Sequence, residues 1–132
     1  MPPQYAVLIC DDDADVRAAM RRTLHAYAVH EAADPREAMA ALKQHRFAAV
    51  VSDFSLNADS DGLEFLQMVK LLYPELVRFL VTGTRDLDVA LRAVNEGSVD
   101  RFFLKPWDDL KLQSALELLL HTRQDDSADS MY

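Results

Sequence analysis

Residues 6–13 read AVLICDDD, a run of five apolar residues followed at once by three aspartates. A short, continuous apolar run is typical of a strand that helices cover on both faces of a parallel sheet. Parallel strands deliver the residues that follow them to one edge of the sheet, where ligands bind. The stretch therefore predicts a buried first strand that presents Asp11, Asp12 and Asp13 at a functional edge.

The same strand pattern recurs along the chain and alternates with amphipathic helices. Further strands are predicted at residues 29–32, 47–52, 77–81 and 101–104, and helices are predicted from residue 14, after Asp34, over 63–72, after Asp86 and from about Asp108. Asp34, Pro35 and Glu37 form a capping-box pattern at a helix start, Asp86 can cap the helix that follows it, and Gly97 suits a helix end. Strands and helices that alternate through short connections predict a doubly wound (βα)5 α/β fold with a five-stranded parallel sheet.

Composition limits both the domain count and the partners. With 132 residues, half of them apolar, the chain can bury one core, so we expect one domain over residues 1–124 and a disordered polar tail over 125–132. The net charge of −8 disfavours direct binding to nucleic acid or to anionic membranes. Cys10 is alone and cannot form a disulfide framework, and no stretch is long and apolar enough to span a membrane, so we expect a cytoplasmic protein.

Four of the five predicted strands deliver a charged or reactive side chain to this edge of the sheet. The first delivers Asp11 and Asp12, the third Asp53, the fourth Thr82 and the fifth Lys105. Three close carboxylates repel one another unless a cation neutralises them, and oxygen ligands with room for water suit Mg²⁺. A carboxylate can attack phosphorus, and a metal, a hydroxyl and an ammonium group can stabilise the transferred group.

These residues lie in motifs that resemble those of the receiver domains of two-component response regulators. LICDDDADV resembles their acidic first-strand motif, VVSDF their phosphoacceptor strand, VTGT their hydroxyl motif and FFLKPW their lysine-proline motif. The resemblance runs from about residue 5 to about residue 122 and implies the flavodoxin-like receiver fold. It further implies that Asp53 accepts the phosphoryl group and that Asp11, Asp12, Asp53 and the backbone carbonyl of Ser55 hold Mg²⁺.

The resemblance also implies how such a site works. Thr82 would follow the phosphoryl group, Lys105 would pair with it, and Phe102 would rotate as the switch aromatic. The protein would act as a phosphorylation-dependent switch that assists its own phosphorylation and dephosphorylation, rather than as a conventional enzyme. Its partners would be a sensor histidine kinase or phosphotransfer protein and an unidentified output, and the chain would be a monomer or weak homodimer.

Two features concern subfamily and kinetics. Asn57 stands where the family usually has proline, and the loop from there to Gly62 is one residue longer than usual, which affects the expected lifetime of the phosphoryl group. The stretch VNEGSVDRFFLKPWDD resembles receivers attached to outputs such as HD-GYP-type phosphodiesterases.

The same residues also fit other interpretations. Asp12 or Asp13 can simply cap the first helix, and Phe102 and Trp107 can be ordinary packing aromatics. Asp11-Asp12-Asp13 also resembles the nucleophile motif of haloacid-dehalogenase-type phosphatases, although that hypothesis leaves Asp53 without a role. A third hypothesis is a pseudo-receiver, an interaction module with this fold that is not phosphorylated.

Overall fold

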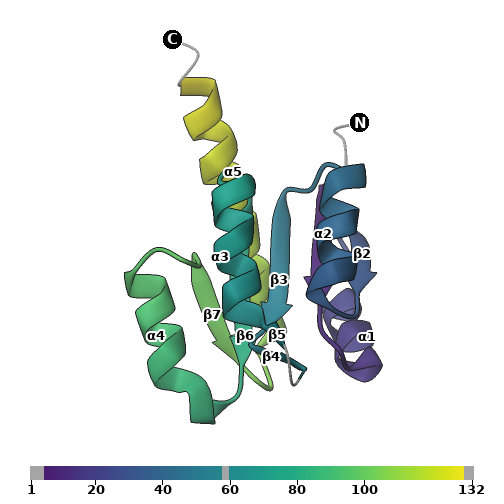
Figure 1. Ribbon diagram of the computed structural model, residues 1–132. Coiled ribbons are helices and arrows are strands. Elements are labelled where there is room, and N and C mark those ends of the chain that lie inside the picture. The colour runs from purple at the N-terminus through teal and green to yellow at the C-terminus, as the bar shows by residue number, and fades with distance from the viewer. Residues whose placement is uncertain (1–4, 58–59, 130–132) are drawn as a thin grey trace.

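The computed structural model describes residues 5–57 and 60–129. Its helices and strands follow one another in the order shown in Figure 1: β1 (Ala6–Cys10), α1 (Ala14–Thr23), β2 (Ala28–Ala32), α2 (Pro35–Gln44), β3 (Ala49–Asp53), β4 (Ser55–Asn57), β5 (Ser60–Asp61), α3 (Gly62–Leu72), β6 (Val77–Thr82), the 3-10 turn η1 (Thr84–Asp86), α4 (Leu87–Asn95), β7 (Arg101–Leu104) and α5 (Asp109–Asp129). The five predicted strands and five predicted helices are all present.

The five longer strands form one parallel sheet in the order β2-β1-β3-β6-β7 (Figure 1). The chain runs from β1 outward to β2 and then returns to β3 on the other side of β1. This reversal of direction between β1 and β3 is the switch point at which open α/β sheets bind ligands. In register Cys10 lies opposite Ser52, so Asp11 and Asp53 lie at adjoining strand ends. The predicted doubly wound fold is confirmed.

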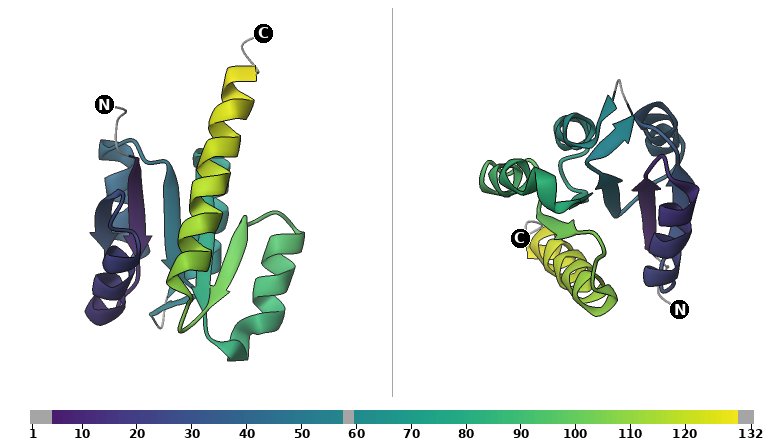
Figure 2. Two further views of the ribbon diagram at one scale, coloured as in Figure 1. Left: turned by 180° about the vertical axis from the view of Figure 1, so that it is seen from behind. Right: turned by 90° about the horizontal axis from the view of Figure 1, so that it is seen from below.

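Helices cover both faces of the sheet and close two separate cores (Figure 2). Alternate residues of β1 point to opposite faces: Leu8 belongs to the core beneath α2, α3 and α4, whereas Ile9 belongs to the core beneath α1 and α5. Cys10 lies in the first of these cores, where burial raises the pKa of its thiol to about 12. The thiol is therefore protonated and enclosed, as expected of a free buried cysteine.

Side-chain caps begin several of the helices. Asp13 accepts hydrogen bonds from the backbone N–H groups of the first turn of α1, and Asp34 accepts one from Glu37 N (2.8 Å). The Glu37 carboxylate accepts from Ala33 N (2.7 Å), one residue before the cap, so the predicted capping box is present in a shifted form. Gly97 has a φ of +78° just after α4 ends, which fulfils its predicted role.

Three details differ from the sequence-based expectations. The polar stretch before Gly62 contains a short antiparallel pair, β4 with β5, where only a loop was predicted. Asp86 precedes α4, but its side chain makes no capping hydrogen bond, because the 3-10 turn η1 already leads into the helix. Helix α5 continues to Asp129, so residues 125–129 extend a helix where a disordered tail was predicted, and residues 130–132 lie outside the described residues.

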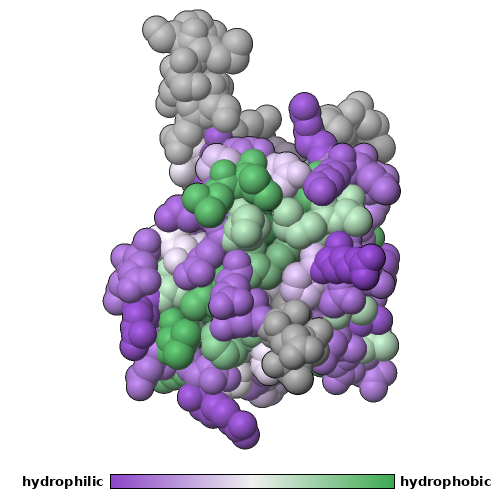
Figure 3. Space-filling model, in the orientation of Figure 1, coloured by the Kyte–Doolittle hydropathy of each residue, from purple (hydrophilic) through white to green (hydrophobic). Residues whose placement is uncertain are grey.

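The surface is polar over most of the face shown in Figure 3, with apolar atoms gathered over the upper part of α3. The exposed apolar side chains of that helix are Met68, Leu71 and Leu72. Among the described residues, no helix is both long enough and apolar enough to cross a membrane.

Candidate functional site

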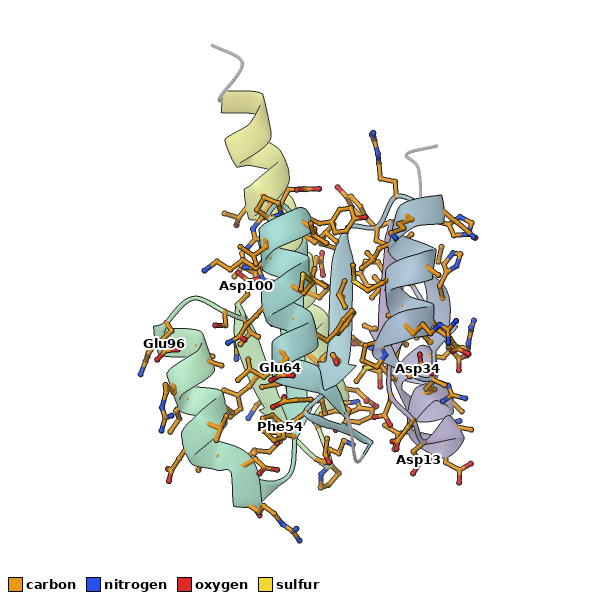
Figure 4. The ribbon with its side chains drawn as sticks, in the orientation of Figure 1. Asp13, Asp34, Phe54, Glu64, Glu96 and Asp100 are labelled. Carbon is orange, nitrogen blue, oxygen red and sulfur yellow. The ribbon has the colours of Figure 1, made fainter. Side chains whose placement is uncertain are left out.

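Three carboxylates converge at the carboxyl edge of the sheet, at the switch point between β1 and β3. One oxygen from each of Asp11, Asp12 and Asp53 lies within 4.8 Å of the others. Asp11 and Asp53 are 3% and 8% exposed, whereas Asp12 is open to solvent. In Figure 4 the labelled neighbours Asp13 and Phe54 mark this edge at the bottom of the view. A cluster of carboxylate oxygens with one side open to water fits the ligand preference of Mg²⁺.

Lys105 brings positive charge to these acids from the end of β7. Its ammonium Nζ lies 2.8 Å from Asp53 Oδ1 and 3.4 Å from Asp11 Oδ2, so it bridges the two buried carboxylates. The backbone N–H of Lys105 donates to the carbonyl of Thr82 (2.8 Å), which ties the start of the turn after β7 to the end of β6. The sheet therefore brings together side chains that are far apart in sequence, as predicted.

The electrostatics of the cluster leave a surplus of negative charge. Burial raises the pKa of Asp53, against the opposing effect of its hydrogen bond with Lys105. Burial also raises the pKa of Asp11, in part offset by the hydrogen bond from Asp13 N (2.9 Å). For Lys105, burial alone would lower the pKa, but its interactions with Asp53 and Asp11 outweigh burial and raise it. One ammonium does not balance three carboxylates, so a divalent cation would relieve the remaining repulsion.

The three consecutive aspartates have different surroundings. Asp13 is the N-cap of α1, and its carboxylate accepts from Asp15 N (2.8 Å) and Val16 N (3.4 Å). Asp11 and Asp12 instead belong to the acidic cluster. The capping alternative therefore holds for Asp13 and not for Asp12.

The other predicted site residues surround the acids less closely. Thr82 ends β6 and is 1% exposed, with its hydroxyl directed to the carbonyl of Gly83 (3.3 Å). Ser55 opens β4 two residues after Asp53. Phe102 lies on β7 opposite Leu80 of β6, half-buried against the core beneath α2, α3 and α4. Thr82 and Phe102 thus lie on adjacent strands.

Two residues support the site and were not singled out in the sequence. Arg17 donates from Nη1 to the backbone carbonyl of Asp11 (2.7 Å) and holds the β1–α1 loop. Gly62 lies against β3, and a Cβ at this position would stand 1.7 Å from the backbone oxygen of Asp53. A lone glycine after a polar loop was the available signal for Gly62, but only the fold shows which atom it approaches.

Comparison with known proteins decides the family. Residues 7–117 match the family model of the response regulator receiver domain. The chain belongs to this family. The expectation drawn from its motifs is therefore confirmed, and the chain is a receiver domain of the two-component response regulators.

Relatives of this receiver domain include regulators that are longer than this chain. It is 36% identical over 113 residues to the C4-dicarboxylate transport transcriptional regulatory protein DctD of Rhizobium meliloti, a match that covers 83% of this chain and 24% of DctD. It is 32% identical over 105 residues to the hydrogenase transcriptional regulatory protein HoxA of Cupriavidus necator, covering 79% of this chain and 22% of HoxA. The chain thus spans less than a quarter of the length of these relatives.

Solved structures agree with the fold of the receiver domain. The signal receiver domain of an HD domain-containing protein from Pseudomonas fluorescens Pf-5 superposes with a TM-score of 0.86 at 28% identity, covering 97% of this chain and 95% of that one. The sequence relatives named above are transcriptional regulators, whereas this structural neighbour comes from an HD domain-containing protein. Similarity at this level identifies the receiver domain and does not select one class of output.

Proposed function

We propose that this receiver domain accepts a phosphoryl group on Asp53 from a histidine kinase or phosphotransfer protein and thereby switches its interaction surface. The observation that carries the proposal is the position of Asp53. Its carboxylate lies at the switch point, is 8% exposed, contacts the Lys105 ammonium at 2.8 Å and shares its site with two further carboxylates. No packing requirement explains a buried acid in this company.

The proposed reaction is a transfer from nitrogen or oxygen to a carboxylate oxygen. An oxygen of Asp53 forms a bond to phosphorus while the phosphorus–nitrogen bond of a phosphohistidine breaks, and the imidazole leaves with its electron pair and takes up a proton. With acetyl phosphate, the phosphorus–oxygen bond breaks and acetate leaves. Lys105 is placed to stabilise negative charge on the transferred group, since its ammonium already lies against Asp53.

Asp11, Asp12 and Asp53 would hold Mg²⁺, together with the backbone carbonyl of Ser55. The donor set fits this ion, because it consists of hard oxygen ligands and one side of it, at Asp12, is open to water. When bound, the ion would neutralise charge on the phosphoryl oxygens. Asp11 has one carboxylate oxygen near Lys105 and the other held by Asp13 N, so its orientation is set before any ion binds.

The switch itself would involve Thr82 and Phe102. A phosphoryl group on Asp53 would bind one arrangement of the Thr82 hydroxyl better than another and so shift the population of the β6–α4 segment. Phe102 would then change its packing, because it lies beside β6 and is only half-buried. The surface formed by α4, β7 and α5 would present the change to a partner.

Family and charge support a proposal for the context of the domain. We propose a cytoplasmic protein whose receiver unit comprises residues 1–124. It would be a monomer or weak homodimer and would contact an output domain or protein of unknown identity. The net charge of −8 argues against direct binding to nucleic acid. The phosphatase alternative is disfavoured because such enzymes need an acidic pair at the end of a further strand, whereas here Asp108 and Asp109 lie at the start of α5, where Asp108 accepts a hydrogen bond from Lys111 N (3.1 Å).

Intact mass spectrometry tests this function. After incubation with acetyl phosphate and Mg²⁺, the wild-type protein should gain one labile phosphoryl group, and Asp53→Asn should gain none. EDTA should slow the reaction greatly. Absence of any adduct would support the pseudo-receiver hypothesis instead, and an adduct that forms equally fast in EDTA would contradict the role of the metal.

A further inference from the structure

The turn that carries Lys105 is fastened to the end of α1 by a chain of hydrogen bonds. Two residues after Lys105, the indole Nε1 of Trp107 donates to the hydroxyl of Thr23 (2.9 Å). The same hydroxyl has two acceptors within reach, Asp109 Oδ1 at 2.6 Å and the backbone carbonyl of Ala19 at 3.2 Å, and the carboxylate is the nearer. Thr23 is 4% exposed and ends α1, so this chain of contacts lies between α1, the turn and the start of α5.

Lys105 is held from its two sides by different elements. On one side its backbone N–H is bonded to the Thr82 carbonyl of β6 (2.8 Å), and on the other the turn continues to Trp107, which packs on the core beneath α1 and α5. The Lys105 side chain must reach Asp53 from this turn. Its path therefore depends on where the turn is fixed at both ends.

Trp107, Thr23 and Asp109 are joined by directional hydrogen bonds in addition to apolar packing. A tryptophan can fill space without a hydrogen bond, but here the Thr23 hydroxyl accepts from the indole and donates to a carboxylate, and so uses both of its capacities. A separate hydrogen bond joins the same helices: Gln113 Nε2 donates to the backbone carbonyl of Thr23 (2.7 Å).

We propose that Thr23 and Trp107 are positioning residues for the phosphoryl transfer. The Trp107–Thr23–Asp109 chain latches the Lys105 turn to α1 and holds the Lys105 ammonium where it contacts Asp53. This inference rests on the proposed function of Asp53 and adds residues to it that touch neither the acids nor the transferred group. The rate of phosphoryl transfer would therefore depend on the hydroxyl group of Thr23 at the end of α1.

Thr23→Val tests the latch, because valine has the shape of threonine and lacks the hydroxyl. The initial rate of phosphorylation by acetyl phosphate at saturating Mg²⁺ should fall about tenfold. Displacement of a catalytic group by about 1 Å can lower a rate by about a hundredfold, and we expect a smaller displacement of the Lys105 ammonium. The Mg²⁺ concentration that gives half the maximal rate should change far less than the rate does, because the hydrogen bond from Asp13 N (2.9 Å) still holds the Asp11 carboxylate in the variant. Trp107→Phe should reproduce both results.

Matched controls separate positioning from general stability. Thr23→Ser keeps the hydroxyl and should restore most of the rate. Gln113→Met removes the separate hydrogen bond between α1 and α5, and it should lower the melting temperature while leaving the rate unchanged. The indole N–H resonance of Trp107, the only tryptophan in the chain, should shift in Thr23→Val and not in Gln113→Met.

The outcomes distinguish the latch from the function on which it rests. If the wild-type protein forms no adduct, the proposed function fails and the latch fails with it. If the wild type is phosphorylated and Thr23→Val reacts at the same rate, the function stands and the latch is wrong. The latch is equally wrong if the Gln113→Met control slows the reaction as much as Thr23→Val does.

Discussion

Asp53 combines burial with charge, and this combination has a measurable energetic consequence. Its carboxyl pKa is raised chiefly by burial, so the folded protein binds that proton more tightly than the unfolded chain does. A raised acid pKa contributes stability below the unfolded value, and this contribution is lost as the pH rises through the folded value. At neutral pH without Mg²⁺, the ionised Asp53 therefore destabilises the fold.

We expect Asp53→Asn to raise the melting temperature at pH 7 in EDTA by roughly a few degrees. The gain should shrink as the pH is lowered through the raised pKa of Asp53, where the wild-type carboxyl becomes protonated. Thermal unfolding followed by circular dichroism across this pH range measures the effect. The exposed Asp88→Asn is the control and should change the melting temperature little, whereas an Asp53→Asn protein less stable than wild type at pH 7 would refute the argument.

Gly62 and Gly83 form a matched pair for the backbone beside the site. A Cβ at Gly62 would collide with the backbone of Asp53 at 1.7 Å, whereas a Cβ at Gly83 meets nothing within 4 Å. Gly62→Ala should destabilise the domain by about 3 kcal/mol or more, because backbone atoms must move, and Gly83→Ala should change stability by less than about 1 kcal/mol. Urea titrations of the two variants would decide, and equal stabilities would contradict the close approach.

At the scale of elements, helix α3 shows how strongly position determines the contribution of a leucine. Leu66 is fully buried beneath this helix, whereas Leu71 on the same helix is 77% exposed. Leu66→Ala should cost about 2–5 kcal/mol of unfolding free energy, and Leu71→Ala should stay within about 0.5 kcal/mol. Chemical denaturation measures both values, and a large loss in Leu71→Ala would mean that the exposed face of α3 is covered in solution.

Apolar runs and helix caps predicted the strands and helices well because each pattern depends only on residues close together in the sequence. The run before Asp11 and the cap at Asp34 lie within single elements, and both proved correct. The β4–β5 pair escaped prediction because strands of two or three polar residues are too short to display a period. The length of α5 escaped prediction because a run of polar residues does not mark where a helix ends.

The candidate site was predictable to the extent that parallel strands deliver their ends to one edge. This rule alone is enough to predict that Asp53 and Lys105 lie close together, as they do. The contact between Trp107 and Thr23 joins residues 84 positions apart through side-chain geometry, which no spacing in the sequence displays. The same holds for His30 and His45, which show no ligand pattern along the chain although their ring centroids lie 5.0 Å apart.

At the scale of the whole molecule, binding of a cation at one edge should stabilise the entire domain. Because the ion would bind the folded cluster and not the unfolded chain, Mg²⁺ at ten times its dissociation constant should add about 1.4 kcal/mol to the free energy of unfolding. Thermal melts with increasing Mg²⁺ measure this, and the increment should vanish in Asp11→Asn. An equal increment in that variant would place the ion elsewhere.

The fold joins the site to a distant end of the molecule through rigid elements. Arg123 of α5 pairs with Asp100, just before β7, and also donates to the carbonyl of Leu76 (2.8 Å), at the edge opposite the acids. Figure 4 shows Asp100 well away from Asp13 and Phe54. Strand β7 thus begins next to the Asp100–Arg123 ion pair with α5 and ends at the turn that carries Lys105. Helix α5 therefore contacts the residue before β7 and also follows the turn after it.

Chemical mapping of the phosphorylated residue tests the central claim most directly. Reduction of an aspartyl phosphate with borohydride converts that aspartate to homoserine, which peptide mass spectrometry locates. After treatment with acetyl phosphate and Mg²⁺, we predict homoserine at position 53 and unchanged aspartates at positions 11 and 12. Homoserine at Asp11 or Asp12 with an unmodified Asp53 would contradict the account.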